Sequence, residues 1–382
     1  MKFPYEWWLK DGYPAKGVKA HNKTVFGTFI CGGGSSMGYK LAGFDHLGGV
    51  EMDPQVAAAY KINHNPKYLY VEDIRDFNDR NDLPEELYNL DLLDGSPPCS
   101  SFSMAGSRDK AWGKEKHFRE WQKKQRLDDL VFIYIDTIKK LKPKTAVLEN
   151  VKGLVQGNAK AYARKIKSDF ESTGYKVQVF LLNSATMGVP QARERVFFVG
   201  VRSDVYKQDI NLKFNEDPVY FKEIDEGIVT NAEYKIAPCD LKYYDQCKPG
   251  AAISSVHPKS NRFNSFKLSP GKVCKTITAG SSCYHPKQKR ALQNIELKKI
   301  GSYPQDYDFQ AIKPQYLIGM SVPPVMTAHI ASQIYSQWLK PLLRNPLLPS
   351  LHRPSQRLQQ RLLLARQRPP LQPHRPAAPL HR

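Results

Sequence analysis

An apolar segment that runs into a triple glycine is the feature that most restricts the fold of this chain. Residues 24–30 are apolar enough to form a buried strand, and Gly32, Gly33 and Gly34 follow as a turn before a stretch with helical character. Glycines between a strand and a helix let the backbone approach a nucleotide-like ligand closely. The pattern therefore predicts an α/β domain with a ligand-binding loop near its start.

The rest of the chain repeats this alternation of strands and helices. Short apolar strands are expected at residues 47–51, 91–93 and 145–148, and an antiparallel pair at residues 177–182 and 195–201. Strands that alternate with helices form an open α/β sheet, with ligands at the carboxyl ends of the strands. Helical periodicity returns at residues 325–339, where we expect a helix that packs back on this sheet.

Composition divides the chain into five parts. They are an aromatic and polar extension (1–23), a strand- and helix-rich domain that begins with the glycine turn (24–202), a smaller loop-rich domain (203–312), a helix that returns to the first domain (313–340) and a low-complexity tail (341–382). Within the smaller domain, residues 203–265 have little regular pattern, as expected for a loop-rich recognition region. The tail suits either a basic arm on DNA or a disordered extension, and we expect disorder.

The formal charge of +20 at pH 7 points to a polyanionic partner, with nucleic acid favoured. The tail carries eight arginines and neither lysine nor acid, which leaves +12 for the other residues. The six cysteines form no Cys-x-x-Cys pair, so we expect neither a metal site nor a disulfide framework. No apolar run approaches the roughly 18 residues that span a bilayer, and we expect a cytoplasmic protein.

The acids that follow the glycine turn suit a nucleoside cofactor. Glu51 ends the next predicted strand, where a carboxylate can bind ribose hydroxyls, and Asp73-Ile74 can hold an adenine. The loop lacks the Gly-Lys-Ser/Thr of a phosphate-binding ATPase. Glycine spacing alone leaves both a dinucleotide and S-adenosylmethionine open.

Three further motifs suit methylation of cytosine at carbon 5. A thiolate that adds to carbon 6 makes carbon 5 nucleophilic, and Cys99 follows two prolines that fix its backbone. Glu149 is the candidate acid near ring nitrogen 3, and its pKa would have to rise in a closed pocket.

Arg193 and Arg195 are alternate residues at a strand start and therefore project on the same face. They could bind the exocyclic oxygen of the base and an adjacent phosphate, with Gln191 supporting the turn.

With these motifs in this order, the chain resembles the C5-cytosine DNA methyltransferases of prokaryotes and phages, of the restriction-modification type. The resemblance covers nearly all of residues 24–340. The blocks that carry it are residues 30–35, Glu51, Asp73-Ile74, Pro97-Pro98-Cys99, Glu149-Asn150-Val151, residues 191–195 and residues 319–324.

The resemblance implies a Rossmann-like S-adenosylmethionine-dependent methyltransferase fold with a smaller recognition domain. It implies that Cys99 is the nucleophile, Glu149 the acid, and Arg193 and Arg195 the residues that hold a base flipped out of double-stranded DNA. Pro98, Asn150 and Gln191 would support them. The implied cofactor pocket consists of Ile30, Gly32, Gly33, Gly34, Ser35, Glu51, Met52, Asp73, Ile74, Pro97, Leu130, Met320, Ser321 and Val322. The protein would act as a monomer, with a cognate restriction endonuclease as its functional partner.

The chain departs from the family pattern at two positions and has one long insertion. Met320 stands where the family usually has asparagine, and Ile30 replaces the usual phenylalanine of the cofactor loop. Residues 100–126 form a long basic segment that we expect to close over DNA and contact phosphates. Its expected DNA contacts are Ser101, Ser103, Lys110, Lys114, Lys116 and Lys123.

Two alternative functions stay open at this point. A tRNA cytosine methyltransferase shares the catalytic blocks, but the long region 203–265 and the absence of a Cys-Phe-Thr motif count against it. A catalytically silent DNA-binding regulator on the same fold is the second. Intact Cys99, Glu149 and Arg195 count against this regulator, whereas Met320 favours it.

Overall fold

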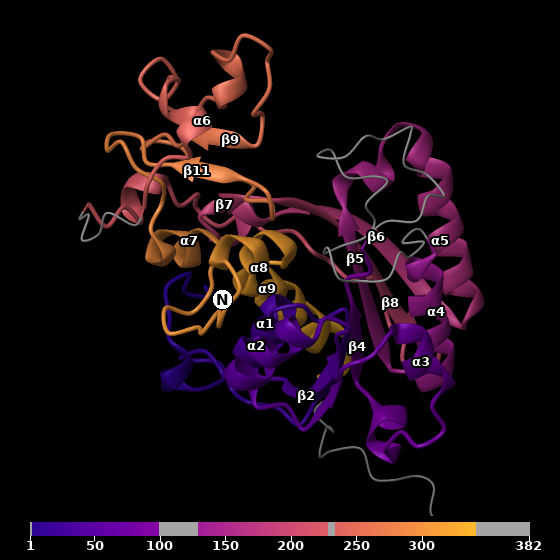
Figure 1. Ribbon diagram of the computed structural model, residues 1–382. Helices are drawn as coiled ribbons and strands as arrows, with labels where there is room; N and C mark the ends of the chain where they lie inside the picture. The colour runs from indigo at the N-terminus through magenta and orange to yellow at the C-terminus, as the bar shows by residue number, and fades with distance from the viewer. Residues whose placement is uncertain (1, 99–128, 228–233, 341–382) are drawn as a thin grey trace, which may run out of the picture. The chain divides into compact units, whose positions relative to one another are not determined.

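A seven-stranded sheet forms the centre of the part of the chain that the computed structural model describes, residues 2–98, 129–227 and 234–340 (Figure 1). Its strands are β1 (Thr24–Thr28), β2 (Asp45–Val50), β3 (Tyr68–Tyr70), β4 (Leu92–Gly95), β5 (Thr145–Val151), β6 (Tyr175–Asn183) and β8 (Glu194–Arg202). They lie in the order β3-β2-β1-β4-β5-β8-β6, and β8 runs antiparallel to both β5 and β6. The predicted α/β sheet and its antiparallel pair are confirmed.

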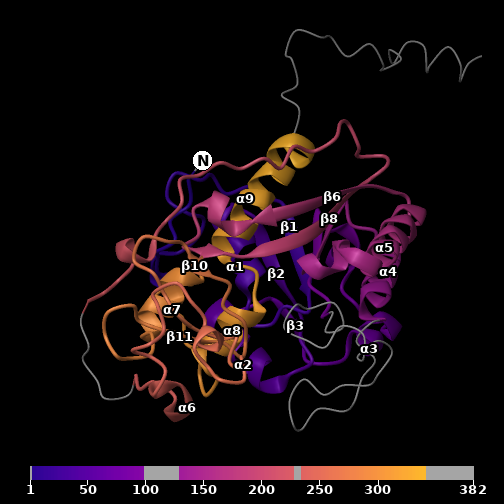
Figure 2. The ribbon, with the colours of Figure 1, turned by 90° about the horizontal axis from the view of Figure 1, so that it is seen from above.

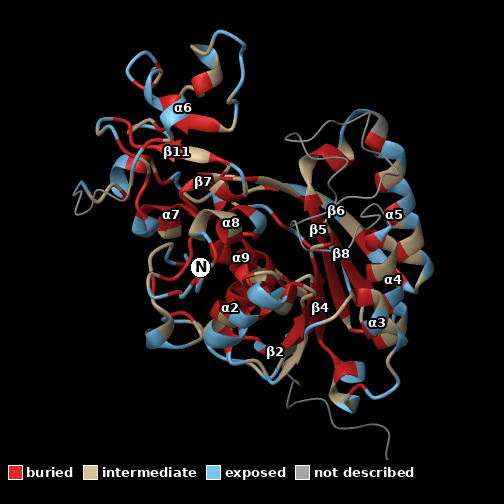
Figure 3. Ribbon diagram, viewed as in Figure 1, coloured by how far each residue is buried: buried red, intermediate tan, exposed pale blue. Residues whose placement is uncertain are grey.

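Helices cover both faces of the sheet (Figure 2). One face carries α1 (Gly34–Leu41), α2 (Pro54–His64) and α9 (Pro324–Ile334), and the other carries α3 (Ile74–Asp79), α4 (Leu130–Leu141) and α5 (Lys160–Ser172). Each face has its own apolar core, and the strands β1, β2, β4, β5 and β8 between them are largely buried, whereas the edge strands β3 and β6 are partly exposed (Figure 3). A sheet buried on both faces explains why its central strands are continuous apolar runs in the sequence.

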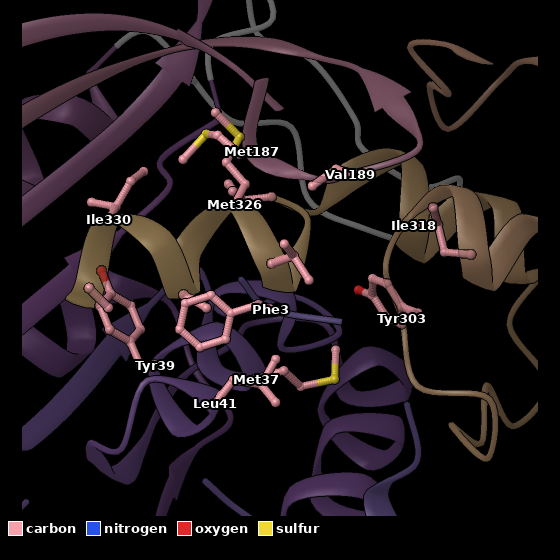
Figure 4. Packing of buried hydrophobic residues seen from close by; sticks show 14 of the residues in the cluster. Phe3, Met37, Tyr39, Leu41, Met187, Val189, Tyr303, Ile318, Met326 and Ile330 are labelled. Atoms are coloured by element: carbon pink, nitrogen blue, oxygen red, sulfur yellow. The ribbon is translucent and has the colours of Figure 1, made fainter. Parts of the chain in front are cut away.

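The helix expected at residues 325–339 is present as α9, followed by a π-helical turn (Tyr335–Leu339). Met326 and Ile330 of α9 lie over Tyr39 and Leu41 of α1 (Figure 4). The two helices approach closely, because an added Cβ at Gly38 of α1 would lie 2.4 Å from the carbonyl oxygen of Pro324. This helix therefore belongs to the core of the central sheet.

The N-terminal extension packs on the same core. Phe3 and Trp7 are buried, and the ring of Phe3 meets His329 of α9 edge-on at 5.1 Å. Trp7 Nε1 donates a hydrogen bond to the carbonyl oxygen of Ser302, at 3.0 Å. The extension thus ties the start of the chain to its last third.

After β8 the chain has few regular elements. Before α9 they are β10 (Cys274–Lys275), which pairs with the short strand β7 (Gln191–Ala192) that precedes β8, β9 (Ser265–Lys267), which pairs with β11 (Ser282–Tyr284), and the helices α6 (Pro238–Leu241), α7 (Asn294–Ile300) and α8 (Pro314–Met320). Short 3-10 turns connect elements along the chain: Leu9–Asp11, Glu85–Asn89, Lys152–Val155, Gly157–Ala159, Ser184–Met187, Phe221–Glu223 and Ile253–Ser255. The loop-rich character expected for residues 203–265 is what the described part of this region shows.

Two ion pairs, one buried and one partly exposed, hold together the small region between β8 and α8. Arg290 binds both carboxyl oxygens of Glu296, at 2.7 and 2.8 Å, and Arg262 binds both carboxyl oxygens of Asp240 in the same way. The first residues after β8 remain against the sheet, because the Gln178 side chain binds both the N–H and the carbonyl of Ile210. The domain boundaries stay a prediction, and the tail after Lys340 lies outside the described residues.

Candidate active site

The predicted motifs meet at one edge of the sheet. The strand order reverses between β1 and β4, which is where open α/β sheets bind ligands at the carboxyl ends of their strands. Thr28 of β1 pairs with Gly95 of β4, and Gly95 pairs with Leu148 of β5. The glycine loop, the segment that leads to Cys99 and the acid Glu149 therefore begin side by side.

Glu149 and Arg195 form an ion pair at this edge. Arg195 Nε lies 2.9 Å from Glu149 Oε1, and the two side chains are 14% and 12% exposed. The strand register brings them together, because β5 and β8 are antiparallel neighbours and both residues lie near the same end of the pair. Burial lowers the pKa of Arg195, and the Glu149 carboxylate opposes this shift. A carboxyl that a guanidinium holds from one side suits hydrogen bonding to a base.

Asn150 links this acid to the strand end that precedes Cys99. Its Nδ2 donates to the carbonyl oxygen of Pro97 at 3.1 Å, and its Oδ1 accepts from the N–H of Val151 at 2.8 Å. Asn150 is buried, so both bonds are protected from water. The side chain thereby fixes the start of the Pro97-Pro98 segment relative to β5.

Cys99 itself lies outside the described residues. So do the expected DNA contacts of the long basic segment, which are Ser101, Ser103, Lys110, Lys114, Lys116 and Lys123. Their assigned roles stay predictions.

Arg193 and Gln191 connect the sheet to the later part of the chain. The two terminal nitrogens of Arg193 donate to the carbonyl oxygens of Ile277 and Gly319, at 2.9 and 2.8 Å. Gln191 accepts from the N–H of Ile277 at 3.0 Å and donates to the carbonyl of Ile300 at 3.3 Å. Arg193 is fully enclosed, and burial lowers the pKa of its guanidinium. These main-chain partners give Arg193 a structural role, and its contact with the base stays a prediction.

The glycine loop is shaped by close backbone approach. Gly33 has a φ of +79°, which favours glycine, and an added Cβ at this position would lie 2.1 Å from His64 Nε2. An added Cβ at Gly34 would lie 2.4 Å from the carbonyl oxygen of Val322. The structure therefore brings the loop of residues 32–35 against Ser321 and Val322, which lie almost 300 residues later in the sequence.

Glu51 lies next to the glycine loop and is hydrogen-bonded to it. Its carboxyl oxygens accept the N–H groups of Cys31 and Asp53, both at 2.9 Å, and burial raises its pKa to about 7. Glu51 is partly buried, and among the described residues only backbone N–H groups donate to its carboxyl, so lone pairs are left for hydroxyl donors. Its place at the end of β2 beside the glycine loop fits a nucleoside ribose.

The other predicted cofactor residues differ in their surroundings. Ile30, Ile74, Leu130 and Pro97 are buried, whereas Met52 is partly buried. Asp73 caps α3 and pairs with Arg75 at 3.1 Å. Met320 is 37% exposed, and the hydroxyl of neighbouring Ser321 lies 2.6 Å from that of Tyr303. Their cofactor contacts stay predictions.

One buried acid at this edge was not predicted from the sequence. Asp94 of β4 is 6% exposed, and its Oδ1 accepts from the hydroxyl of Tyr39 at 3.0 Å. Its signal in the sequence is a charged residue inside an apolar strand, five positions before Cys99.

One cluster in the described residues has the composition of a metal site, namely Asp225, His285 and Glu296. Its donor atoms serve other contacts. His285 Nδ1 accepts two backbone N–H groups, its Nε2 lies 3.0 Å from Asp225, and Arg290 binds both oxygens of Glu296. We therefore interpret the cluster as a hydrogen-bond network of the small region.

None of the helices in the described residues combines the length and the apolar character that crossing a membrane requires.

The sequence is similar to those of known proteins. The sequence matches the family model "C-5 cytosine-specific DNA methylase" over residues 25–232 and 207–336. It is 28% identical to the Type II methyltransferase M.DdeI of Desulfomicrobium norvegicum, over 79% of this chain and 86% of that protein. It is 32% identical to the orphan methyltransferase M.SPRI of Bacillus phage SPR, over 55% of this chain and 41% of that protein.

A solved structure has the same fold. A DNA modification methyltransferase encoded within an E. coli prophage superimposes with a TM-score of 0.65 at 20% identity, over 82% of this chain and 99% of that one. The chain thus belongs to the C-5 cytosine-specific DNA methylase family, and it is a DNA cytosine methyltransferase that uses S-adenosylmethionine.

Proposed function

We propose that this protein methylates carbon 5 of a flipped cytosine within a specific sequence of double-stranded DNA, through a covalent bond between Cys99 and carbon 6. The observation that carries the proposal is the buried Glu149–Arg195 ion pair, which Asn150 ties to the segment that leads to Cys99. An acid and a guanidinium at the sheet edge, beside the segment that leads to a cysteine, suit a planar base.

Each residue has a defined task in this reaction. The Cys99 thiolate adds to carbon 6, and Glu149 protonates ring nitrogen 3 as the electrons of the ring move toward it. Arg195, held by Glu149, binds the exocyclic oxygen. S-adenosylmethionine, when bound, supplies the methyl group. As carbon 5 takes up the methyl group, nitrogen 3 returns its proton to Glu149. Loss of the carbon 5 proton to water then expels the Cys99 thiolate and restores the aromatic ring.

The cofactor pocket proposed here is formed by the glycine loop, Glu51 and the Ser321-Val322 segment. The Glu51 carboxyl accepts hydrogen bonds from the ribose hydroxyls, in addition to those from Cys31 and Asp53. Close contact between Gly34 and Val322 supports a single pocket built from both parts of the chain. Binding would therefore depend on their contact.

The biological setting that we propose is restriction-modification or solitary phage methylation in the cytoplasm, by a monomer. The relatives named Type II and orphan methyltransferases support this setting. Plasmid DNA from cells that express the protein should carry 5-methylcytosine at one short sequence, which bisulfite sequencing would identify. Size-exclusion chromatography with light scattering tests the monomer.

The decisive experiment measures the product. The protein is incubated with labelled S-adenosylmethionine and mixed-sequence duplex DNA, and the DNA is digested to nucleosides. We expect labelled 5-methylcytosine from the wild type and none from Cys99→Ser, with cofactor affinity nearly unchanged in the variant. Strong methylation by Cys99→Ser would contradict the assigned nucleophile, and a product on tRNA but not on DNA would contradict the substrate.

A further inference from the structure

Asp94 is a buried acid that the proposed reaction leaves without a task. The hydroxyls of Tyr39 and Ser35 donate hydrogen bonds to its carboxyl group, the first at 3.0 Å. No lysine, arginine or histidine among the described residues forms an ion pair with it. Buried carboxylates in proteins are usually paired with a cation, so this arrangement requires an explanation.

The position of Asp94 connects the two halves of the proposed active site. Ser35 and Tyr39 lie four residues apart on α1 and therefore project toward Asp94 from one helix face, directly behind the glycine loop. On the other side, Asp94 pairs with Val147 of β5, so Glu149 lies on the same sheet face, two residues further along. The neighbour of Asp94 on β1 is Gly27, and the side chains of Ile30 and His46 lie over this glycine, at 2.6 and 3.7 Å from the position of an added Cβ.

Among the described residues, the groups near Asp94 are Ser35 and Tyr39 on α1, His46 on β2, Tyr60 on α2, Tyr134 on α4 and Glu149 on β5. Burial lowers the pKa of His46 to about 3, so at pH 7 this histidine is uncharged and all these groups are neutral or negative. Burial, and next the charge of Glu149, raise the pKa of Asp94 to about 7, while its two hydroxyl partners oppose the shift. Glu149 differs, because Arg195 neutralises it. A cation that entered next to Asp94 would meet an uncompensated carboxylate.

We propose that Asp94 is the counter-charge for the sulfonium of S-adenosylmethionine, and that cofactor binding ionises Asp94 and releases its proton. The inference rests on the proposed cofactor pocket. The sulfonium carries a fixed positive charge, whereas the sulfur of the product S-adenosylhomocysteine is neutral. Asp94 would therefore favour the substrate form of the cofactor over the product form and help the product to leave.

Calorimetry on the full chain tests the inference without measuring methyl transfer. Each ligand is titrated at pH 7 in buffers of different ionisation enthalpy, which gives the number of protons released. A group with a pKa of about 7 is half protonated at this pH, so S-adenosylmethionine should release about half a proton more than S-adenosylhomocysteine. Glu51 also has a raised pKa, but it is expected to face the ribose that both ligands share, so its contribution cancels in the difference.

Two variants separate charge from structure. Asp94→Asn removes the charge and keeps the size, and we expect the preference for S-adenosylmethionine to fall about tenfold or more, since one pKa unit of coupling is a tenfold change in affinity. The extra proton release should disappear. Tyr39→Phe removes a hydroxyl partner of Asp94 and keeps the charge, so it should retain both effects.

The possible failures are distinguishable. If both ligands release the same number of protons from the wild type, or if Asp94→Asn weakens both ligands equally, Asp94 has only a structural role and the inference is wrong. If neither ligand binds the wild type, or if Glu51→Gln leaves both affinities unchanged, the proposed cofactor pocket is wrong instead.

Discussion

Replacing Asn150 with aspartate should remove one of the two hydrogen bonds that this side chain makes at the end of β5 and keep the other. Aspartate keeps the oxygen that accepts the N–H of Val151 but loses the amide that donates to the Pro97 carbonyl. The change therefore acts on the link between Glu149 and the segment before Cys99. Asn150→Asp should impair methyl transfer and leave the affinity for S-adenosylmethionine largely intact.

The magnitude follows from burial. Asn150 is 2% exposed, so the carbonyl of Pro97 would lose its donor in a site that water does not reach easily. An unsatisfied buried polar group costs about 1–3 kcal/mol, and the new carboxylate next to a carbonyl oxygen adds repulsion. If the loss of this hydrogen bond displaces the nucleophile, the same energy is added to the activation free energy of methyl transfer. Turnover then falls about tenfold to a hundredfold, because 1.4 kcal/mol is a factor of ten.

Single-turnover methylation and urea unfolding measure the two effects separately. Asn183→Asp is the matched control, because Asn183 also accepts a backbone N–H, from Ala185 at 3.0 Å, and lies at the end of β6. It undergoes the same chemical change, and we expect turnover within about twofold of the wild type. Unchanged turnover and stability in Asn150→Asp would refute the positioning role of the Pro97 hydrogen bond.

Three further predictions test other parts of the molecule. Gly34→Ala places a Cβ 2.4 Å from the carbonyl oxygen of Val322, so calorimetry should show at least about tenfold weaker binding of S-adenosylmethionine. Arg290→Ala leaves the buried carboxylate of Glu296 unpaired, and urea unfolding should show a loss of about 3–5 kcal/mol. The raised pKa of Asp94, about 7, contributes stability that is complete below the unfolded pKa near 4 and is lost as the pH rises through 7. Asp94→Asn should therefore gain about 3 kcal/mol relative to the wild type between pH 5 and pH 8, and an equal difference at both pH values would contradict the shift.

Local patterns in the sequence predicted the fold well. Apolar runs located the strands, because a sheet buried on both faces tolerates few polar residues. The error at β1 has a local cause. The strand ends at Thr28 and not at residue 30, because Phe29 and Cys31 take positive φ values of 55° and 48° and the chain turns before the glycines begin.

The candidate site was less predictable, because its contacts depend on residues that are far apart in the chain. The spacing of Arg193 and Arg195 suggested a shared task. In the structure, Arg195 binds Glu149, whereas Arg193 binds carbonyls 84 and 126 residues away. Backbone carbonyls have no sequence signature, so a buried arginine that binds them cannot be recognised from spacing. The role of Asp94 was missed for a similar reason, since its hydroxyl partners lie on another element.

The packing of the N-terminal extension and of α9 into one core has a consequence for biosynthesis. Phe3 meets His329, and Trp7 binds the carbonyl of Ser302. At about 5–20 residues per second, a ribosome makes these partners roughly 15–60 s after the first residues. During that time the apolar face of α1 has no α9 to cover it. A translation product that stopped before Pro324 would keep this face exposed, which makes it a target for chaperones and proteases.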